Sequence, residues 1–180
     1  MAMVTKIKDL QVHSGDVFFF DTNVWMFIYG PMAGSRTDKQ RAYSNLLKDI
    51  QTARASIFVS SLVIAEYVNA CLQISFRNWK KLPENVLANN FKRDYRGTES
   101  YNDTILDIKG QVRDILRFAD KTPDSFNSVD VTRFFDLNDI DFNDAYYIEL
   151  CKMHSNNVIL VTDDSDILNS PNASVKMLTA

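Results

Sequence analysis

The sequence predicts an α/β fold with a central, mostly parallel sheet flanked by helices. Three short apolar runs, Val17–Phe20, Ser56–Val59 and Val158–Val161, have the length and composition of buried strands. Segments in which apolar residues recur at helical spacing lie between these runs. Strands that alternate with helices are typical of a parallel sheet covered by helices.

Helix signals can be placed along the chain. Thr37 and Gln40 have the spacing of a capping box, and Ser60 or Ser61 can cap the next helix. The pattern weakens between Cys71 and Thr98, where we expect helical pieces broken near Pro83. The predicted helices run from Thr37 through Ile50, from Leu62 to about Leu72, from Ile105 to Ala119 and from about Asn143 to His154, and a last strand covers Val175–Leu178.

The bulk composition fits one globular domain spanning residues 1–180. The chain is 46% hydrophobic and 24% charged, which is typical of a folded protein that is neither disordered nor a membrane protein. No apolar run is long enough to span a bilayer, and the first ten residues lack the apolar core of a signal peptide. Cys71 and Cys151 lie in helical patterns and are interpreted as reduced, buried thiols. Together these features predict a cytoplasmic protein without membrane contact.

Acidic residues follow two of the predicted strands. Asp21-Thr22-Asn23 comes directly after the first strand, and Thr162-Asp163-Asp164 comes directly after the third. In parallel sheets the ligand site lies just beyond the carboxyl ends of the strands. Two strands therefore deliver acids to the same edge of the sheet.

Two further acids lie on the apolar faces of predicted helices. Asp144 shares a face with Ile148 and Cys151, and Glu66 shares one with Ala70. A carboxylate on a core-facing stripe is costly unless it is paired or binds a metal. One such acid alone is explained as well by a capping or helix-dipole role. The functional interpretation depends on four acids occurring together.

Four converging carboxylates would repel one another, and a divalent cation would relieve that repulsion. The set holds only oxygen ligands, with Thr22, Asn23 and Thr162 as neighbouring donors. Ligands of this kind suit Mg²⁺ or Mn²⁺ rather than Zn²⁺. Such ions clamp phosphates and activate water, so the pattern indicates phosphoryl chemistry. The formal net charge of −3 speaks against a strong non-specific nucleic-acid binder, but it is compatible with a metal-assisted site.

The order and context of these motifs resemble the PIN domain family, and within it the VapC-type toxin ribonucleases. The resemblance covers about residues 16–167 and rests on four segments: Asp21-Thr22-Asn23 after a strand, Ser61 through Glu66, Asp144-Ala145, and Thr162 through Asp166. It implies a PIN-like three-layer fold. It also implies a Mg²⁺- or Mn²⁺-dependent endoribonuclease, with a small antitoxin partner and homodimer formation as family associations.

The resemblance assigns roles to particular residues. The catalytic and metal-binding acids fall on Asp21, Glu66, Asp144 and Asp164, and the accessory polar positions fall on Asn23 and Thr162. Asp141 and Asp166 are further candidates, because each lies close in sequence to one of the four acids. Asp163 is an equivalent neighbour of Asp164, and Asp166 is also explained as the N-cap of a short helix.

The chain departs from the family pattern in places. Ile167 stands where the last motif usually has an aromatic residue, and about residues 73–97 are expected to form a helical insertion. Residues 76–96 include six basic residues with aromatic residues between them. This pattern indicates binding of single-stranded or structured RNA, in which cations contact the backbone and exposed aromatic rings stack on bases. The other interpretation is a solvated helix face with aromatics turned to the core. The basic residues are Arg77, Lys80, Lys81, Lys92, Arg93 and Arg96.

Two other functions are compatible with part of this pattern. The haloacid-dehalogenase phosphohydrolases also place an Asp after an apolar strand, but they need a second Asp where Asn23 stands. A catalytically silent PIN-like module that binds RNA or protein is the non-enzymatic alternative, and the four filled acid positions speak against it.

Tyr146 and Tyr147 are interpreted as core residues.

Overall fold

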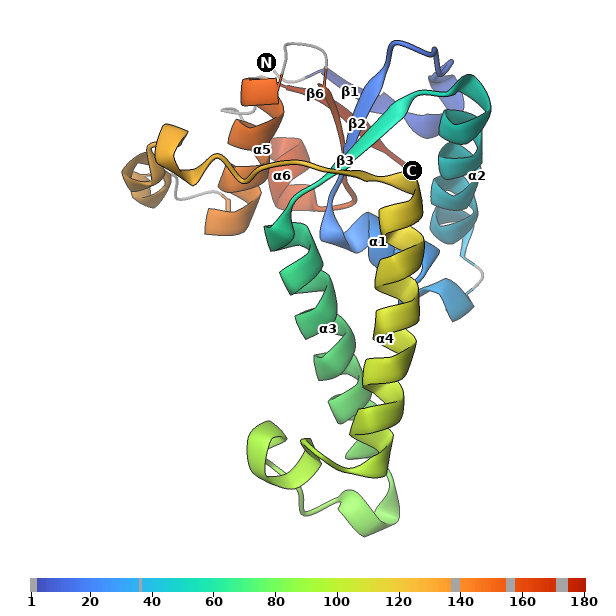
Figure 1. Cartoon of the computed structure of the whole chain (residues 1–180), viewed down its shortest axis with the longest axis vertical. Helices are drawn as coiled ribbons and strands as arrows, with labels where there is room; N and C mark the ends of the chain where they lie inside the picture. The colour runs from blue at the N-terminus through green and yellow to red at the C-terminus, as the bar shows by residue number, and fades with distance from the viewer. Residues whose placement is uncertain (1–2, 36, 137–139, 155–157, 171–174) are drawn as a thin grey trace.

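The computed structural model describes residues 3–35, 37–136, 140–154, 158–170 and 175–180. Within them the centre of the molecule is a six-stranded sheet in the order β1-β6-β5-β2-β3-β4 (Figure 1). Every neighbouring pair is parallel, which confirms the predicted α/β fold. The strands are β1 (Met3–Lys6), β2 (Val17–Phe20), β3 (Ser56–Val59), β4 (Asp120–Lys121), β5 (Val158–Val161) and β6 (Lys176–Thr179).

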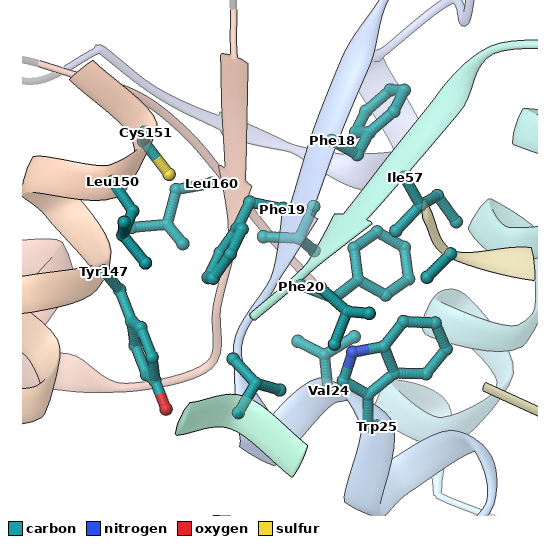
Figure 2. Packing of buried hydrophobic residues seen from close by; sticks show 14 of the residues in the cluster. Phe18, Phe19, Phe20, Val24, Trp25, Ile57, Tyr147, Leu150, Cys151 and Leu160 are labelled. Atoms are coloured by element: carbon teal, nitrogen blue, oxygen red, sulfur yellow. The ribbon is translucent and has the colours of Figure 1, made fainter. Parts of the chain in front are cut away.

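Helices cover both faces of this sheet. The Phe19 ring lies 5.5 Å from the Tyr147 ring of helix α5 (Phe142–His154), and the Phe20 ring lies 5.0 Å from the Trp25 ring of helix α1 (Thr22–Ile28) (Figure 2). Successive residues of a strand point to opposite faces, so α1 and α5 pack on opposite sides of β2. The helices are α1 (Thr22–Ile28), α2 (Asp38–Ala53), α3 (Ser61–Trp79), α4 (Glu99–Phe118), α5 (Phe142–His154) and α6 (Ser165–Asn169).

The chain changes direction across the sheet between β2 and β5. The segment after β2 leads to β3 on one side, whereas the segment after β5 leads to β6 on the other side. Such a switch point opens a crevice at the carboxyl ends of the two strands, where α/β proteins bind ligands. Asp21 and Thr162 are the first residues beyond these two ends.

The sequence signals for most elements are confirmed. The three apolar strands have the predicted bounds, and the last strand lies one residue later than expected. The Thr37 side chain accepts a hydrogen bond from the Gln40 amide at 3.2 Å and caps α2. The Ser60 side chain caps α3 by accepting from the Val63 amide at 3.3 Å.

Some elements differ from the prediction. Helix α3 does not end near Leu72 but continues to Trp79, because the buried Phe76 ring packs on the rings of Phe91 and Tyr95. Helix α1 was not predicted, since its residues are buried on nearly all sides and show no polar face. The short edge strands β1 and β4 were not predicted either, and β4 consists of two exposed charged residues.

Helices α3 and α4 form a long hairpin that extends away from the sheet (Figure 1). Its tip contains a 3₁₀ turn over Pro83–Asn85 and a π-helical turn over Phe91–Tyr95. Gly97 has a φ of 86°, which an L-residue rarely adopts, and it lets the chain turn into the Thr98 N-cap of α4. The interpretation of residues 73–97 as an insertion stays a prediction.

Both cysteines, Cys71 and Cys151, are free and buried, as expected. Among the helices that the structure describes, none combines the length and the apolar content needed to cross a bilayer.

Candidate active site

Asp21 occupies the carboxyl end of β2 as a buried carboxylate that is only 3% exposed. Its amide donates to the Val161 carbonyl at 3.0 Å, which continues the pairing of β2 with β5 by one step. The Thr162 hydroxyl donates to Oδ2 of Asp21 at 2.8 Å. The ends of two neighbouring strands therefore hold Asp21 in place, as the sequence predicted for this edge.

Asp164 is the third residue beyond the end of β5 and caps helix α6. Its Oδ1 accepts from the Asp166 amide at 2.8 Å, and its own amide donates to the Thr162 hydroxyl oxygen at 3.0 Å. Thr162 thus contacts both Asp21 and Asp164. The expectation that Asp166 caps this helix was wrong, because the capping carboxylate belongs to Asp164, whereas Asp166 is exposed in the first turn.

Asp163 is turned toward α2. Its Oδ2 lies 2.7 Å from Nζ of Lys39, and its Oδ1 accepts from the Tyr43 hydroxyl at 3.2 Å. The carboxylate of Asp163 is therefore paired with a cation, while the neighbouring Asp164 is not paired with one among the described residues. This difference separates two acids that the sequence left equivalent.

Glu66 projects from the second turn of α3 and is held by side chains from two other helices. The Thr22 hydroxyl of α1 donates to Oε2 at 2.9 Å. From α5, the Tyr147 hydroxyl also donates to Oε2, and Nδ2 of Asn143 donates to Oε1. Both oxygens are thus engaged by neutral donors, which fix the carboxylate without neutralising its charge.

The N-terminus of α3 is anchored from the segment after β4. The Ser61 amide donates to Oδ1 of Asp124 at 3.1 Å, and the Ser61 hydroxyl donates to Oδ2 of the same carboxylate. A carboxylate at a helix N-terminus is favoured by the helix dipole. This anchor fixes the start of α3 one turn before Glu66.

Asp144 lies in the first turn of α5 and is partly buried. Burial raises the pKa of its carboxyl to about 7, and the charges of Asp21, Asp164, Asp141 and Glu66 add to the rise in that order. Asp141 itself is exposed and acts on Asp144 as a nearby charge.

The pKa of the Asp21 carboxyl is raised for the same physical reasons. Burial raises its pKa to about 6, against the hydrogen bond from Thr162, which lowers it. The charges of Glu66 and Asp164 add to the rise. Asp144 feels the charges of the other three acids, and Asp21 feels those of Glu66 and Asp164, so the four carboxyl groups lie near one another. Perturbed carboxyls of this kind cluster at functional sites.

This arrangement has the chemistry of an open site for a hard cation. The donors are carboxylate and hydroxyl oxygens. Burial, and then repulsion between the acids, raises the pKa values of Asp21 and Asp144, and an approaching cation would offset both effects. Across the described residues, no three or more His, Cys, Asp or Glu side chains are arranged so that together they could hold a metal ion. Mg²⁺ typically keeps several water ligands and uses one or two carboxylates, so an open acid cluster fits it.

The six predicted RNA-binding residues lie at the far end of the α3–α4 hairpin. Arg77 is eleven residues beyond Glu66 on α3, which corresponds to about 16 Å along the helix axis. Of the six, Arg93 pairs with Asp94 at 2.6 Å, and Nζ of Lys80 lies 5.5 Å from the centre of the Phe76 ring. Arg77, Lys81, Lys92 and Arg96 are exposed.

The aromatic residues of this segment pack on one another. The Tyr95 ring is fully buried and lies 5.2 Å from the Trp79 ring and 5.5 Å from the Phe76 ring. These rings form a small core that closes the tip of the hairpin. The expectation of stacking platforms for bases is therefore wrong for Phe76 and Tyr95, and the alternative with aromatics turned inward holds for them.

Sequence reasoning missed two residues of the site. Tyr147 is buried as predicted, but its hydroxyl contacts Glu66, so it is more than a core residue. Asn143 was given no role, although it stands beside Asp144 and one helical turn before Tyr147. Conversely, the predicted accessory residue Asn23 makes no side-chain hydrogen bond within the described part of the chain, and Asn143 supplies the amide that contacts a carboxylate.

Comparisons with known proteins agree with this description. The crystal structure of VapBC2 from Rickettsia felis bound to a DNA fragment from their promoter is similar in fold, with a TM-score of 0.51 and 14% identity. The alignment covers 89% of this chain and 96% of that chain. No curated protein gives a significant match. Residues 18–171 match the family model described as PIN domain, a family whose members are generally nucleases that use divalent metal ions. The chain belongs to the PIN domain family.

Proposed function

We propose that this protein is a Mg²⁺- or Mn²⁺-dependent endoribonuclease that hydrolyses RNA phosphodiester bonds. The observation that carries the proposal is the buried Asp21 at the switch point of the sheet, with a pKa raised to about 6 among neighbouring acids. A buried acid among half-buried acids, without a local cation, is unfavourable for folding and therefore indicates a functional demand. Membership of a nuclease family fits that demand.

The four acids would hold the cation or cations: Asp21, Glu66, Asp144 and Asp164. When bound, a divalent cation polarises the phosphodiester and favours ionisation of water near neutral pH. Positive charge would also lower the raised pKa values of Asp21 and Asp144 and so keep both carboxyl groups ionised near neutral pH.

The remaining polar residues of the site position these acids. Thr162 orients Asp21 and the turn that carries Asp164. Thr22, Asn143 and Tyr147 fix both oxygens of Glu66 from two helices. Such outer partners set ligand direction, and their removal typically changes metal affinity or activity by about 10–100-fold.

The substrate we propose is RNA, single-stranded or structured. The basic residues of the hairpin tip would bind phosphates of the RNA backbone that lie far along the strand from the bond cut at the acids. Such contacts add affinity by charge alone and need no contact with a base. The proposed contacts are Arg77, Lys80, Lys81, Lys92, Arg93 and Arg96, with Arg93 the weakest candidate since it is already paired with Asp94. The segment 73–97 that carries them is proposed to be a helical insertion in the single PIN domain.

The biological role we propose is that of the toxin in a toxin–antitoxin pair. The fold similarity to VapBC2 and the motifs shared with VapC-type proteins support it. In this proposal a small antitoxin covers the acidic site, the toxin forms a homodimer, and the protein works in the cytoplasm. The free, buried thiols Cys71 and Cys151 fit a reducing compartment.

The test is cleavage of a mixed-sequence single-stranded RNA by purified protein with EDTA, Mg²⁺ or Mn²⁺. We expect cleavage by the wild type only with a divalent cation, and none by Asp21→Asn. RNA binding without cleavage under every metal would instead favour a catalytically silent binding module. A collapsed melting transition of Asp21→Asn would make Asp21 a structural residue rather than a catalytic one.

A further inference from the structure

A pocket of about 400 Å³ lies beside the acids, between the first turns of α3 and α5 and the segment after β4. Its volume is within the range of small-molecule sites, which is roughly 300–1,000 Å³. The walls are mainly apolar and aromatic, and their polar residues are Ser61, Asp124 and, at the side of the acids, Asn143. The walls include Leu62, Ala65, Phe126, Phe142, Asn143 and Tyr146.

Hydrogen bonds from two helices hold the segment that forms one wall. The Asp124 carboxylate accepts from the backbone and the side chain of Ser61, at the start of α3. The Asp124 carbonyl accepts from the Tyr146 hydroxyl of α5 at 2.6 Å. The pocket is thus part of the same framework that positions Glu66 and Asp144.

Aromatic rings at the pocket are left facing solvent. Phe126 is 67% exposed and Phe142 is 41% exposed. The Phe142 ring also packs edge-on against the Phe134 ring at 5.4 Å, which fixes its plane. Exposed aromatic faces of this kind are costly in water and mark binding surfaces when they gather around a cavity.

Asn143 connects the pocket with the acids. Its Nδ2 donates one hydrogen bond to Oε1 of Glu66 while its side chain lines the pocket. Among the hydrogen bonds of the described residues, none uses Oδ1 or the second N–H of this amide. A side-chain amide with one donor and one acceptor available can read the edge of a nucleobase.

We propose that this pocket is a base-binding subsite that takes one unstacked base of the RNA, next to the phosphodiester at the acids. This inference rests on the proposed function. A base has two flat apolar faces that suit aromatic walls, and its polar edge suits the Asn143 amide. An aliphatic side chain of a protein partner would use the apolar walls and leave that amide unpaired. Continuity with the acids through Asn143 favours the base.

The experiment measures KM and kcat for a short single-stranded RNA whose cut position has been mapped with the wild type. Phe126→Ala is the test variant, and Phe118→Ala is its control, since Phe118 is 40% exposed and does not line the pocket. We expect Phe126→Ala to raise KM about tenfold with little change in kcat, because base–aromatic stacking is of that strength. Phe118→Ala should match the wild type.

A second RNA tests whether the pocket holds a base. An abasic nucleotide is placed in turn at each position around the cut. At one position it should raise the wild-type KM about as much as Phe126→Ala does, and the two changes together should add nothing. Independent effects, or unchanged kinetics in Phe126→Ala, would overturn the subsite. Loss of binding to a protein partner alone would assign the pocket to protein docking and would also overturn it.

A readout without catalysis separates this proposal from the proposed function. RNA carrying 5-iodouridine is cross-linked by light to the protein in EDTA, and the modified residues are identified by mass spectrometry. Cross-links at Phe126, Phe142 or Tyr146 support the subsite even if no metal gives cleavage. Cross-links confined to other surfaces, or no RNA binding at all, would overturn it. Cleavage without pocket cross-links would leave the nuclease standing and remove only the subsite.

Discussion

The Tyr147 hydroxyl donates a hydrogen bond to Oε2 of Glu66, across the space between α5 and α3. A tyrosine that is fully buried in the core thereby reaches the acidic site with its polar end. The same Oε2 accepts from Thr22, so a core residue of α5 and the first residue of α1 jointly fix one carboxylate. The packing of α5 on the sheet therefore helps to set the position of the Glu66 carboxylate.

Tyr147→Phe is expected to lower metal-dependent cleavage by about tenfold, because Glu66 loses one of its orienting donors. The fold should persist, since the ring and its packing remain. Metal affinity measured by calorimetry should fall together with kcat. Tyr67→Phe is the matched control: Tyr67 is also fully buried on α3, but its hydroxyl donates to Gln111 at 2.8 Å and not to an acid. Equal effects of both variants would show that Tyr147 acts only through stability.

Thr162→Val should lower both stability and metal-dependent cleavage, although it barely changes the volume of the side chain. The valine keeps the volume but removes the donor to Asp21 and the acceptor for the Asp164 amide. Leaving such buried groups unpaired costs about 1–3 kcal/mol each, and the pKa of Asp21 should rise further because this hydrogen bond lowers it. Denaturant unfolding and cleavage against pH measure the two effects. Thr162→Ser, which keeps the hydroxyl, is the control and should retain wild-type activity. Unchanged stability and an unchanged pH profile in Thr162→Val would contradict the role of Thr162.

The metal-free protein should lose stability as the pH rises from about 4 to above 7. In the folded state the pKa values of Asp21 and Asp144 are about 6 and about 7, above their ordinary value of 3.8, so folding retains protons that the unfolded chain releases. Melting temperatures in EDTA should therefore be higher at pH 5 than at pH 8. Asp144→Asn should reduce this difference, and Asp103→Asn, an exposed acid of α4, should not. A melting temperature that rises over this range for the wild type would contradict the account.

Mg²⁺ or Mn²⁺ should raise the melting temperature of the wild type at pH 8, where the acids are most fully ionised. Binding to the folded state alone stabilises by about 2.7 kcal/mol when the ion is present at 100 times its Kd. The double variant Asp21→Asn/Asp144→Asn should lose most of this response and should be more stable than the wild type in EDTA. An equal response of both proteins would place the ion elsewhere.

Replacing Arg77, Lys80 and Lys81 together with alanine should weaken RNA binding and reduce its dependence on salt. For a single strand, removing one cation that neutralises a phosphate should lower the slope of log K against log salt by about 0.7. A triple variant of Lys8, Lys48 and Lys176, which lie outside the hairpin, controls for total charge. If both triple variants weaken binding equally, the hairpin tip does not bind RNA specifically.

The sheet and the strand-end acids were predictable because they depend on local patterns. Buried strands such as Val17–Phe20 need no alternation, and the acids that follow them must lie at one edge of a parallel sheet. Helix α1 was not predictable from periodicity, since it is buried on nearly all sides. The inward packing of Tyr95 was equally hidden, because sequence alone does not say which face of a segment meets the core.

The roles of Asn143 and Tyr147 could not be predicted for a different reason. Their partner Glu66 lies 77 and 81 residues away in sequence, and the contacts depend on how α5 is rotated against α3. Likewise, Asp163 differs from Asp164 through tertiary contacts with Lys39 and Tyr43 of α2. Side-chain direction at the site follows from tertiary packing, which no local signal encodes.

In the proposed function Asp21 and its partners, rather than neighbouring acids, carry catalysis. The most direct test compares Asp21→Asn with Asp163→Asn in cleavage of single-stranded RNA at saturating Mn²⁺. Asp163 is close in sequence to the site, but its carboxylate faces Lys39. We expect no cleavage by Asp21→Asn, without loss of stability, and clear metal-dependent cleavage by Asp163→Asn. Wild-type cleavage by Asp21→Asn would show that Asp21 is not a catalytic residue.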